Sequence, residues 1–169
     1  MFKRIFWFMT GGLAALAGLF FLAGKWADVR YSGSKSAVVD APVDKVWNLV
    51  DDTRLFSESR HEVSRAEILG TNASGFDVWK EHTNLAGTIS LEVVRKEPPR
   101  LIEVRMNESG FGMTGTWTYE FEPEGERTKV TVTENSVTEG LLMRSILNLL
   151  GRDANLNLHL KAIKKGAEI

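Results

Sequence analysis

The side chains that could carry out acid–base or metal chemistry are few and scattered along the sequence. The three histidines, His61, His82 and His159, show none of the spacings that bring two metal ligands together. The chain has no cysteine, which excludes thiolate metal sites, cysteine nucleophiles and disulfides. It also has no glycine-rich phosphate loop and no G-x-S-x-G nucleophile motif. We therefore predict no metal, no cofactor and no catalytic residue set.

Glu81 is the best single polar candidate for a buried site. It follows Trp79 by two positions on a predicted strand, so the two side chains share one face, while His82 points to the opposite face. A carboxyl group inside a cavity is a candidate for ligand binding or proton transfer. Asp153 is a second candidate on the last helix. We favour its interpretation as a helix cap after the break at Gly151.

Six strand-like runs between residues 63 and 136 must position these side chains. Short turn segments rich in glycine, proline or asparagine separate the runs, and connections this short imply an antiparallel meander. The clearest alternation places Met113, Trp117 and Tyr119 on one face and threonines and glutamates on the other, which predicts one buried and one wet face. The runs are 63–69, 76–83, 88–96, 100–107, 113–122 and 127–136.

Helical patterns flank the meander on both sides. A short strand at 36–39 leads to Pro42, which suits the first turn of a helix, and residues 54–56 suggest a second small helix. The apolar stripe of the first helix is Val43, Val46, Trp47 and Val50. Segment 141–168 has helical spacing throughout. Gly151 interrupts it, so we expect one long C-terminal helix with a kink or break there.

The N-terminal segment predicts a membrane anchor. Residues 5–24 carry no charge, and a helix of that length spans about 30 Å, the thickness of a bilayer core. A cleaved signal peptide is the alternative, but its apolar core is normally shorter, and the small-x-small site before Lys25 is poor. We therefore expect an uncleaved transmembrane helix over residues 1–24.

The chain is thus predicted to be a single-pass membrane protein, with a polar tether at 25–34 and one soluble domain at 35–169. Lys3 and Arg4 favour an N-terminus inside the cell, which places the domain on the extracytoplasmic side. The formal net charge of −1 lacks the basic excess of nucleic-acid-binding proteins, so we expect the membrane as a partner and no nucleic acid. The oligomeric state is left open.

The order of these elements resembles the START-like, or Bet v 1-like (SRPBCC), superfamily, and within it the polyketide cyclase/dehydrase and lipid-transport group. The resemblance covers roughly residues 36–168. It departs at residues 56–61, where the family often has Trp-x-Pro, so the family's ligand preference does not carry over. The stretches that carry the resemblance are Asp40 to Trp47 with its Pro42, the Trp79-x-Glu81 motif, Glu97-Pro98-Pro99 and Gly115 to Tyr119.

The resemblance implies an α+β helix-grip fold, in which an antiparallel curved sheet wraps around the long C-terminal helix and leaves an apolar cavity. The alternative is that the same apolar side chains simply fill a core. From the family's architecture and strand parity, the predicted cavity lining is Trp79, Glu81, Ile89, Leu91, Val104, Met106, Met113 and Trp117 from the sheet, with Leu156 and Leu160 from the helix.

Three functions remain open at this point. The first is a binding or transfer module for a lipid or another apolar small molecule. The second is a cyclase- or dehydratase-type enzyme on an apolar substrate, which needs a positioned acid–base pair that the sequence does not supply. The third is a protein-interaction module with a filled core, and the presence or absence of a cavity separates it from the other two.

Overall fold

The computed structural model describes residues 2–84 and 87–168, without the side chains of residues 2–11 and 14. The first half contains α1 (Phe2–Trp26), β1 (Arg30–Val39), α2 (Val43–Asp51), α3 (Thr53–Ser59), β2 (Val63–Thr71) and β3 (Asp77–Thr83). The second half contains β4 (Gly87–Glu97), β5 (Leu101–Ser109), β6 (Met113–Glu124), β7 (Arg127–Thr138), α4 (Leu141–Leu150) and α5 (Ala154–Ala167).

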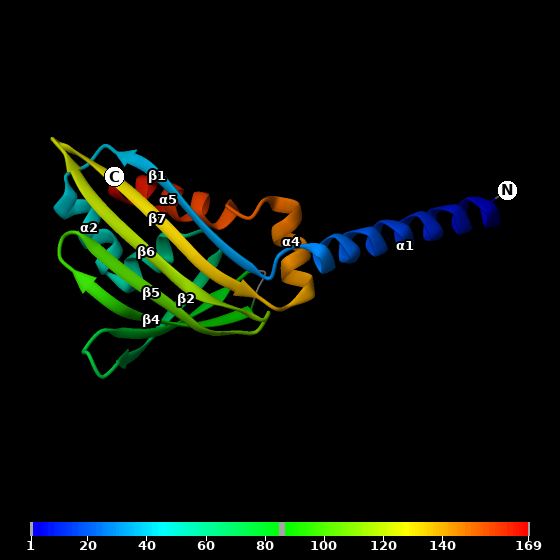
Figure 1. Ribbon diagram of the computed structural model, residues 1–169, viewed down its shortest axis with the longest axis horizontal. Helices are drawn as coiled ribbons and strands as arrows, with labels where there is room; N and C mark the ends of the chain where they lie inside the picture. The colour runs from blue at the N-terminus through cyan, green and yellow to red at the C-terminus, as the bar shows by residue number, and fades with distance from the viewer. Residues whose placement is uncertain (1, 85–86, 169) are drawn as a thin grey trace.

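The strands form one seven-stranded antiparallel sheet in the order β1-β7-β6-β5-β4-β3-β2. Strands β2 to β7 follow one another as neighbours, which confirms the predicted meander. The sheet curves around α5, and α2 and α3 lie on the same side of it (Figure 1). The α+β helix-grip architecture is therefore confirmed.

The core lies between the concave face of the sheet and the helices. Trp117, Tyr119 and Phe121 alternate along β6 and are each only 2% exposed, so the predicted buried face of this strand is confirmed. Trp47 of α2 meets Phe121 edge-on, with ring centroids 5.5 Å apart. Leu156 is fully buried on α5. Complete burial of each such side chain stabilises the fold by about 1.5–3 kcal/mol.

Residues 30–34 are a correction to the predicted tether. They form the first half of β1, which pairs with β7 from Arg30 opposite Val137 to Val39 opposite Thr128. The cause is that β7 runs to Thr138 and its outer edge carries backbone groups that need hydrogen bonds. The serines and the glycine at positions 32–34 are typical of a linker, but the same residue types are also tolerated on a half-exposed edge strand.

The C-terminal segment is two helices and not one long one. The predicted break at Gly151 is confirmed, because this glycine has φ +94°, a conformation that other residues rarely adopt. The sheet wraps around α5, while α4 packs beside the end of α1 (Figure 1). Asp153 lies at the N-cap position of α5, but its side chain makes no capping hydrogen bond. Its carboxylate is instead ion-paired with Lys35 of β1.

Residues 2–26 form one helix, α1, which projects away from the sheet (Figure 1). Within the described residues, no helix is long and apolar enough to cross a membrane. The predicted transmembrane anchor is therefore not supported.

Candidate ligand-binding cavity

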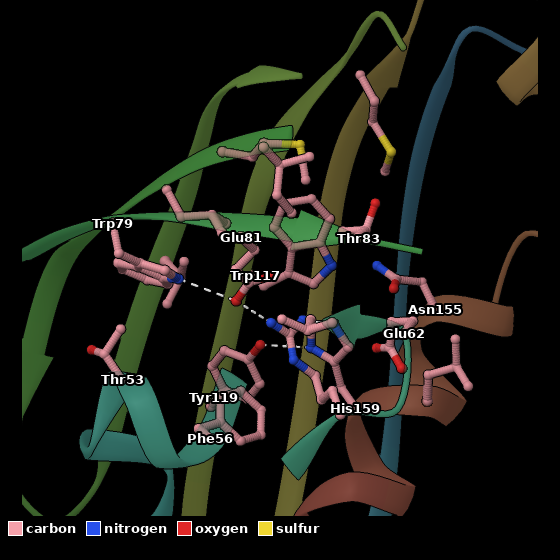
Figure 2. Close-up of a pocket in the computed structure, with 18 of the residues that line it drawn as sticks. Thr53, Phe56, Glu62, Trp79, Glu81, Thr83, Trp117, Tyr119, Asn155 and His159 are labelled. Carbon is pink, nitrogen blue, oxygen red and sulfur yellow. Dashed lines mark hydrogen bonds and ion pairs between the residues drawn. The ribbon is translucent and has the colours of Figure 1, made fainter. Parts of the chain in front are cut away.

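A cavity of about 280 Å³ lies between the concave face of the sheet and the helices. Its walls are mostly apolar side chains from β3 to β6 on one side and from α3, α4 and α5 on the other. The face of α4 that closes it contributes Met143, Ile146, Leu147 and Leu150. Glu81, Tyr119 and His159 lie close together on one wall, where β3, β6 and α5 converge near α3 (Figure 2). A protein-interaction module with a filled core does not fit this interior.

Eight of the ten predicted lining residues lie in the cavity wall: Trp79, Glu81, Ile89, Leu91, Val104, Met106, Met113 and Trp117. Leu156 and Leu160 are a correction, because both are buried in the core beside the cavity and do not line it. The side of α5 that faces the cavity carries Asn155, Leu158 and His159. The break at Gly151 restarts the helix, so its rotation could not be extrapolated from the stripe of α4.

Glu81 is 1% exposed and is the acceptor at the centre of the polar wall. Its Oε1 accepts hydrogen bonds from Ser57 Oγ at 2.7 Å and from Trp79 Nε1 at 3.1 Å. The same oxygen is ion-paired with the Arg60 guanidinium. Trp79 can donate because strand parity places it on the same face two residues earlier. Three donors therefore hold the carboxylate: Ser57 of α3, Arg60 directly after α3, and Trp79 of β3.

Arg60 is the charged residue of this wall that the sequence did not reveal. It follows α3, is 9% exposed, and its guanidinium lies 5.4 Å from the centre of the Phe56 ring. Burial alone would lower its pKa, but the neighbouring Glu81 carboxylate and Tyr119 outweigh burial and raise the pKa of Arg60 above its ordinary value. Its segment is short and polar, and an arginine there is normally expected at the surface. Only the position of Glu81 across the fold brings it inside.

His159 and Tyr119 extend this polar wall. The Tyr119 hydroxyl and His159 Nδ1 are 2.6 Å apart, and Arg60 Nη1 lies 3.3 Å from Nε2 of the same imidazole. The two rings are inclined by only 5°, with centroids 5.8 Å apart. Face-to-face contact needs about 3.5 Å between the ring planes. The hydroxyl oxygen and Nδ1 each lie in the plane of their own ring, so these two parallel planes are at most about 2.6 Å apart. The rings therefore do not stack face to face, and they meet edge to edge through the hydrogen bond.

The protonation of both groups follows from burial. Burial and the positive charge of Arg60 hold the pKa of His159 well below its usual value, so the imidazole is neutral. Burial also raises the pKa of Tyr119 far above that of a free phenol, and the hydroxyl keeps its hydrogen. Strand alternation had placed Tyr119 on the buried face. The position of His159 in the second turn of α5 gave no signal of its partners.

A second buried carboxylate, Glu134 of β7, links α5 to the sheet. Its Oε2 accepts hydrogen bonds from Trp117 Nε1 and Asn155 Nδ2, each at 3.1 Å, and its Oε1 accepts one from Ser136 Oγ at 2.6 Å. Strand parity with Val132 could have predicted its inward position. All its neighbours are donors that satisfy it, so its role is structural. Among the residues that the structure describes, no three His, Asp or Glu side chains are placed to hold a metal ion.

Solved structures share this architecture at low sequence identity. The Zhui aromatase/cyclase from Streptomyces sp. R1128 superimposes with a TM-score of 0.70 at 21% identity, covering 82% of this chain and 94% of that one. A START superfamily protein from Mycobacterium smegmatis gives 0.68 at 15% identity, covering 81% and 97%. Truncated norcoclaurine synthase from Thalictrum flavum gives 0.61 at 18% identity, covering 82% and 94%. These likenesses establish the fold.

No curated protein matches the sequence. The sequence of residues 30–158, from the start of β1 into α5, matches the family model described as polyketide cyclase / dehydrase and lipid transport. The match includes all seven strands and the cavity-lining residues Arg60 and Tyr119. The chain belongs to the polyketide cyclase / dehydrase and lipid transport family.

Proposed function

We propose that the protein binds one apolar small molecule, such as a lipid or a ring compound, in the cavity between the sheet and the helices. The observation that carries this proposal is the wall composition: a mostly apolar cavity of about 280 Å³ in which Glu81, Arg60, Tyr119 and His159 form one linked polar group. Such a site excludes water from most of a ligand, while one polar wall fixes its orientation. The volume is near the lower end of the range for small-molecule sites.

Methionines in the wall support a ligand of irregular shape. Met106 and Met113 line the sheet side and Met143 lines the α4 side. Their unbranched thioether side chains adapt to different outlines, and the indoles of Trp79 and Trp117 cover large apolar areas. Both tryptophans have their N–H groups bonded to glutamates, so they present their apolar surfaces to the cavity as fixed walls.

Fluorescence titration of the full chain with uncharged N-phenylnaphthylamine tests the proposal. We expect saturable binding that a tryptophan placed in the cavity, Leu91→Trp, abolishes. The matched control is Leu142→Trp on the exposed face of α4, which should bind like the wild type. Because Leu91→Trp could unfold the protein, circular dichroism and the milder Val104→Phe variant accompany it. Equal binding by the folded cavity variants and the control would overturn the proposal.

A cyclase- or dehydratase-type enzyme on an apolar carbonyl substrate is the second candidate. The hydrogen-bonded series Tyr119, His159, Arg60 and Glu81 favours it, since these titratable groups meet at the cavity wall. A solved aromatase/cyclase shares the fold, which makes this chemistry worth testing. Incubation with a synthetic aryl polyketone, followed by mass spectrometry, should show loss of water only if this candidate is correct. Unchanged substrate alongside tight binding favours the binding function.

A further inference from the structure

We propose that Tyr119 donates its hydroxyl hydrogen into the cavity, and that the ligand is a mostly apolar, non-anionic molecule whose one carbonyl oxygen accepts it. This inference rests on the proposed binding function and names the ligand class of the same cavity. Arg60 and His159 act as positioning residues, because they fix the direction in which the hydroxyl can donate.

The first step concerns Arg60 and His159. A guanidinium has only donors, so wherever it forms a hydrogen bond its partner must be an acceptor. Arg60 Nη1 lies 3.3 Å from Nε2 of His159, and both residues are buried. Nε2 must therefore carry a lone pair and no hydrogen. A hydrogen on Nε2 would place two donors against each other in a site from which water is excluded.

The second step concerns His159 and Tyr119. The imidazole is neutral and carries one hydrogen, which the first step places on Nδ1. Nδ1 lies 2.6 Å from the Tyr119 hydroxyl oxygen, and the planes of the two rings are nearly parallel. The imidazole is consequently the donor in this bond, and the tyrosine oxygen accepts. The hydrogen of the Tyr119 hydroxyl takes no part in this bond and stays available to another acceptor.

The third step concerns where that hydrogen can go. Tyr119 lines the cavity. Within the described part of the chain, its hydroxyl makes one hydrogen bond, to His159. Figure 2 shows the hydroxyl at the polar wall, beside His159. A buried donor left without an acceptor is unfavourable, so a ligand that brings an oxygen to this point gains affinity over one that does not.

The charges of the wall disfavour an anionic ligand. Arg60 and Glu81 form a closed ion pair, and Ser57 and Trp79 also donate to the carboxylate. Two further carboxylates line the cavity: Asp51 is ion-paired with Lys96, and Glu62 lies 3.3 Å from His61 Nδ1. A ligand carboxylate would therefore lose its hydration beside negative charge. A ketone, an aldehyde or a quinone supplies an acceptor oxygen on an otherwise apolar body.

Two matched probes test the ligand class. Naphthyl methyl ketone carries a carbonyl, and ethylnaphthalene has nearly the same shape without one. We expect calorimetric titration of the full chain to give about tenfold tighter binding of the ketone. Tyr119→Phe should remove that difference while it leaves the hydrocarbon's affinity unchanged. Tyr31→Phe, which alters the other tyrosine, outside the cavity lining, should leave both affinities unchanged.

Nitrogen NMR of isotope-labelled histidine tests the positioning step independently of binding. We expect His159 to be protonated at Nδ1 and bare at Nε2, with its signals assigned by comparison with His61→Gln and His82→Gln variants. Bare Nδ1 would overturn the inference, because the hydroxyl would then donate to the imidazole. Equal affinity for the two probes, or equal weakening of both by Tyr119→Phe, would also overturn it. If the wild type binds neither probe, the proposed function itself fails.

Discussion

Glu81 and Arg60 form a buried ion pair that joins β3 to the end of α3, with residue exposures of 1% and 9%. The pair is surrounded by the Trp79 indole, the Phe56 ring and the Ser57 hydroxyl. Removal of one charge from such a pair leaves the other without compensation in a medium of low dielectric constant. The pair therefore couples the short helix to the sheet at the edge of the cavity.

We expect Glu81→Gln to lower the free energy of unfolding by about 3–5 kcal/mol, because Arg60 then stays buried and charged. The double variant Glu81→Gln, Arg60→Met should recover much of that loss, since no charge remains unpaired. Urea denaturation of the two single variants and the double variant checks this. Losses that simply add in the double variant would contradict a direct interaction.

The neutral state of His159 predicts a loss of stability in acid. Its folded-state pKa lies below the ordinary 6.5, so the unfolded chain binds a proton that the folded chain does not. The contribution is fully present above about pH 6.5 and declines as the pH falls from there toward the lowered pKa. The slope approaches about 1.4 kcal/mol per pH unit. Urea midpoints of wild type and His159→Gln, compared over this range, should show a steeper decline in the wild type, and parallel curves would contradict the prediction.

Leu156 is predicted to matter for stability and not for ligand contact. It is fully buried on α5 but lies outside the cavity lining. Leu156→Ala should lower the free energy of unfolding by about 2–5 kcal/mol through loss of apolar contacts and the new void. Leu149→Ala, at a position 75% exposed on α4, should change it by less than about 0.5 kcal/mol. Folded Leu156→Ala protein that has lost naphthyl ketone binding, under conditions where it is fully native, would show that Leu156 reaches the ligand.

Gly24 is predicted to be the point where α1 docks on α4. A side-chain carbon added there would overlap Ser145, and the Gly24 carbonyl accepts a hydrogen bond from Arg144 Nε at 2.6 Å. Gly24→Val should separate the helices and increase hydrogen exchange in α4. The control is Gly18→Val, because nothing lies within 4 Å of an added carbon at Gly18. Equal exchange in the two variants would show that α1 does not rest on α4 in solution.

The sequence by itself determined the sheet and the sheet side of the cavity. Alternation along the six runs predicted the strands, short turns predicted their order, and parity predicted that Trp79 and Glu81 face inward together. These features depend on residues close in the chain, where a strand's two-residue period fixes the side-chain direction. The resemblance to a known superfamily added the curved sheet and its enclosed helix.

The tertiary structure decided the chemistry of the polar wall. Arg60 and His159 are separated by 99 positions, and Tyr119 and His159 by 40, so no local pattern reports that they touch. No local signal in the sequence indicates that Arg60 is buried, because a buried arginine is stable only beside a partner such as Glu81, and that partner comes from another element. The rotation of α5 was also decided only in three dimensions, because Gly151 ends α4 and packing against the sheet sets the new helix. That packing turned His159, rather than Leu156 and Leu160, toward the cavity.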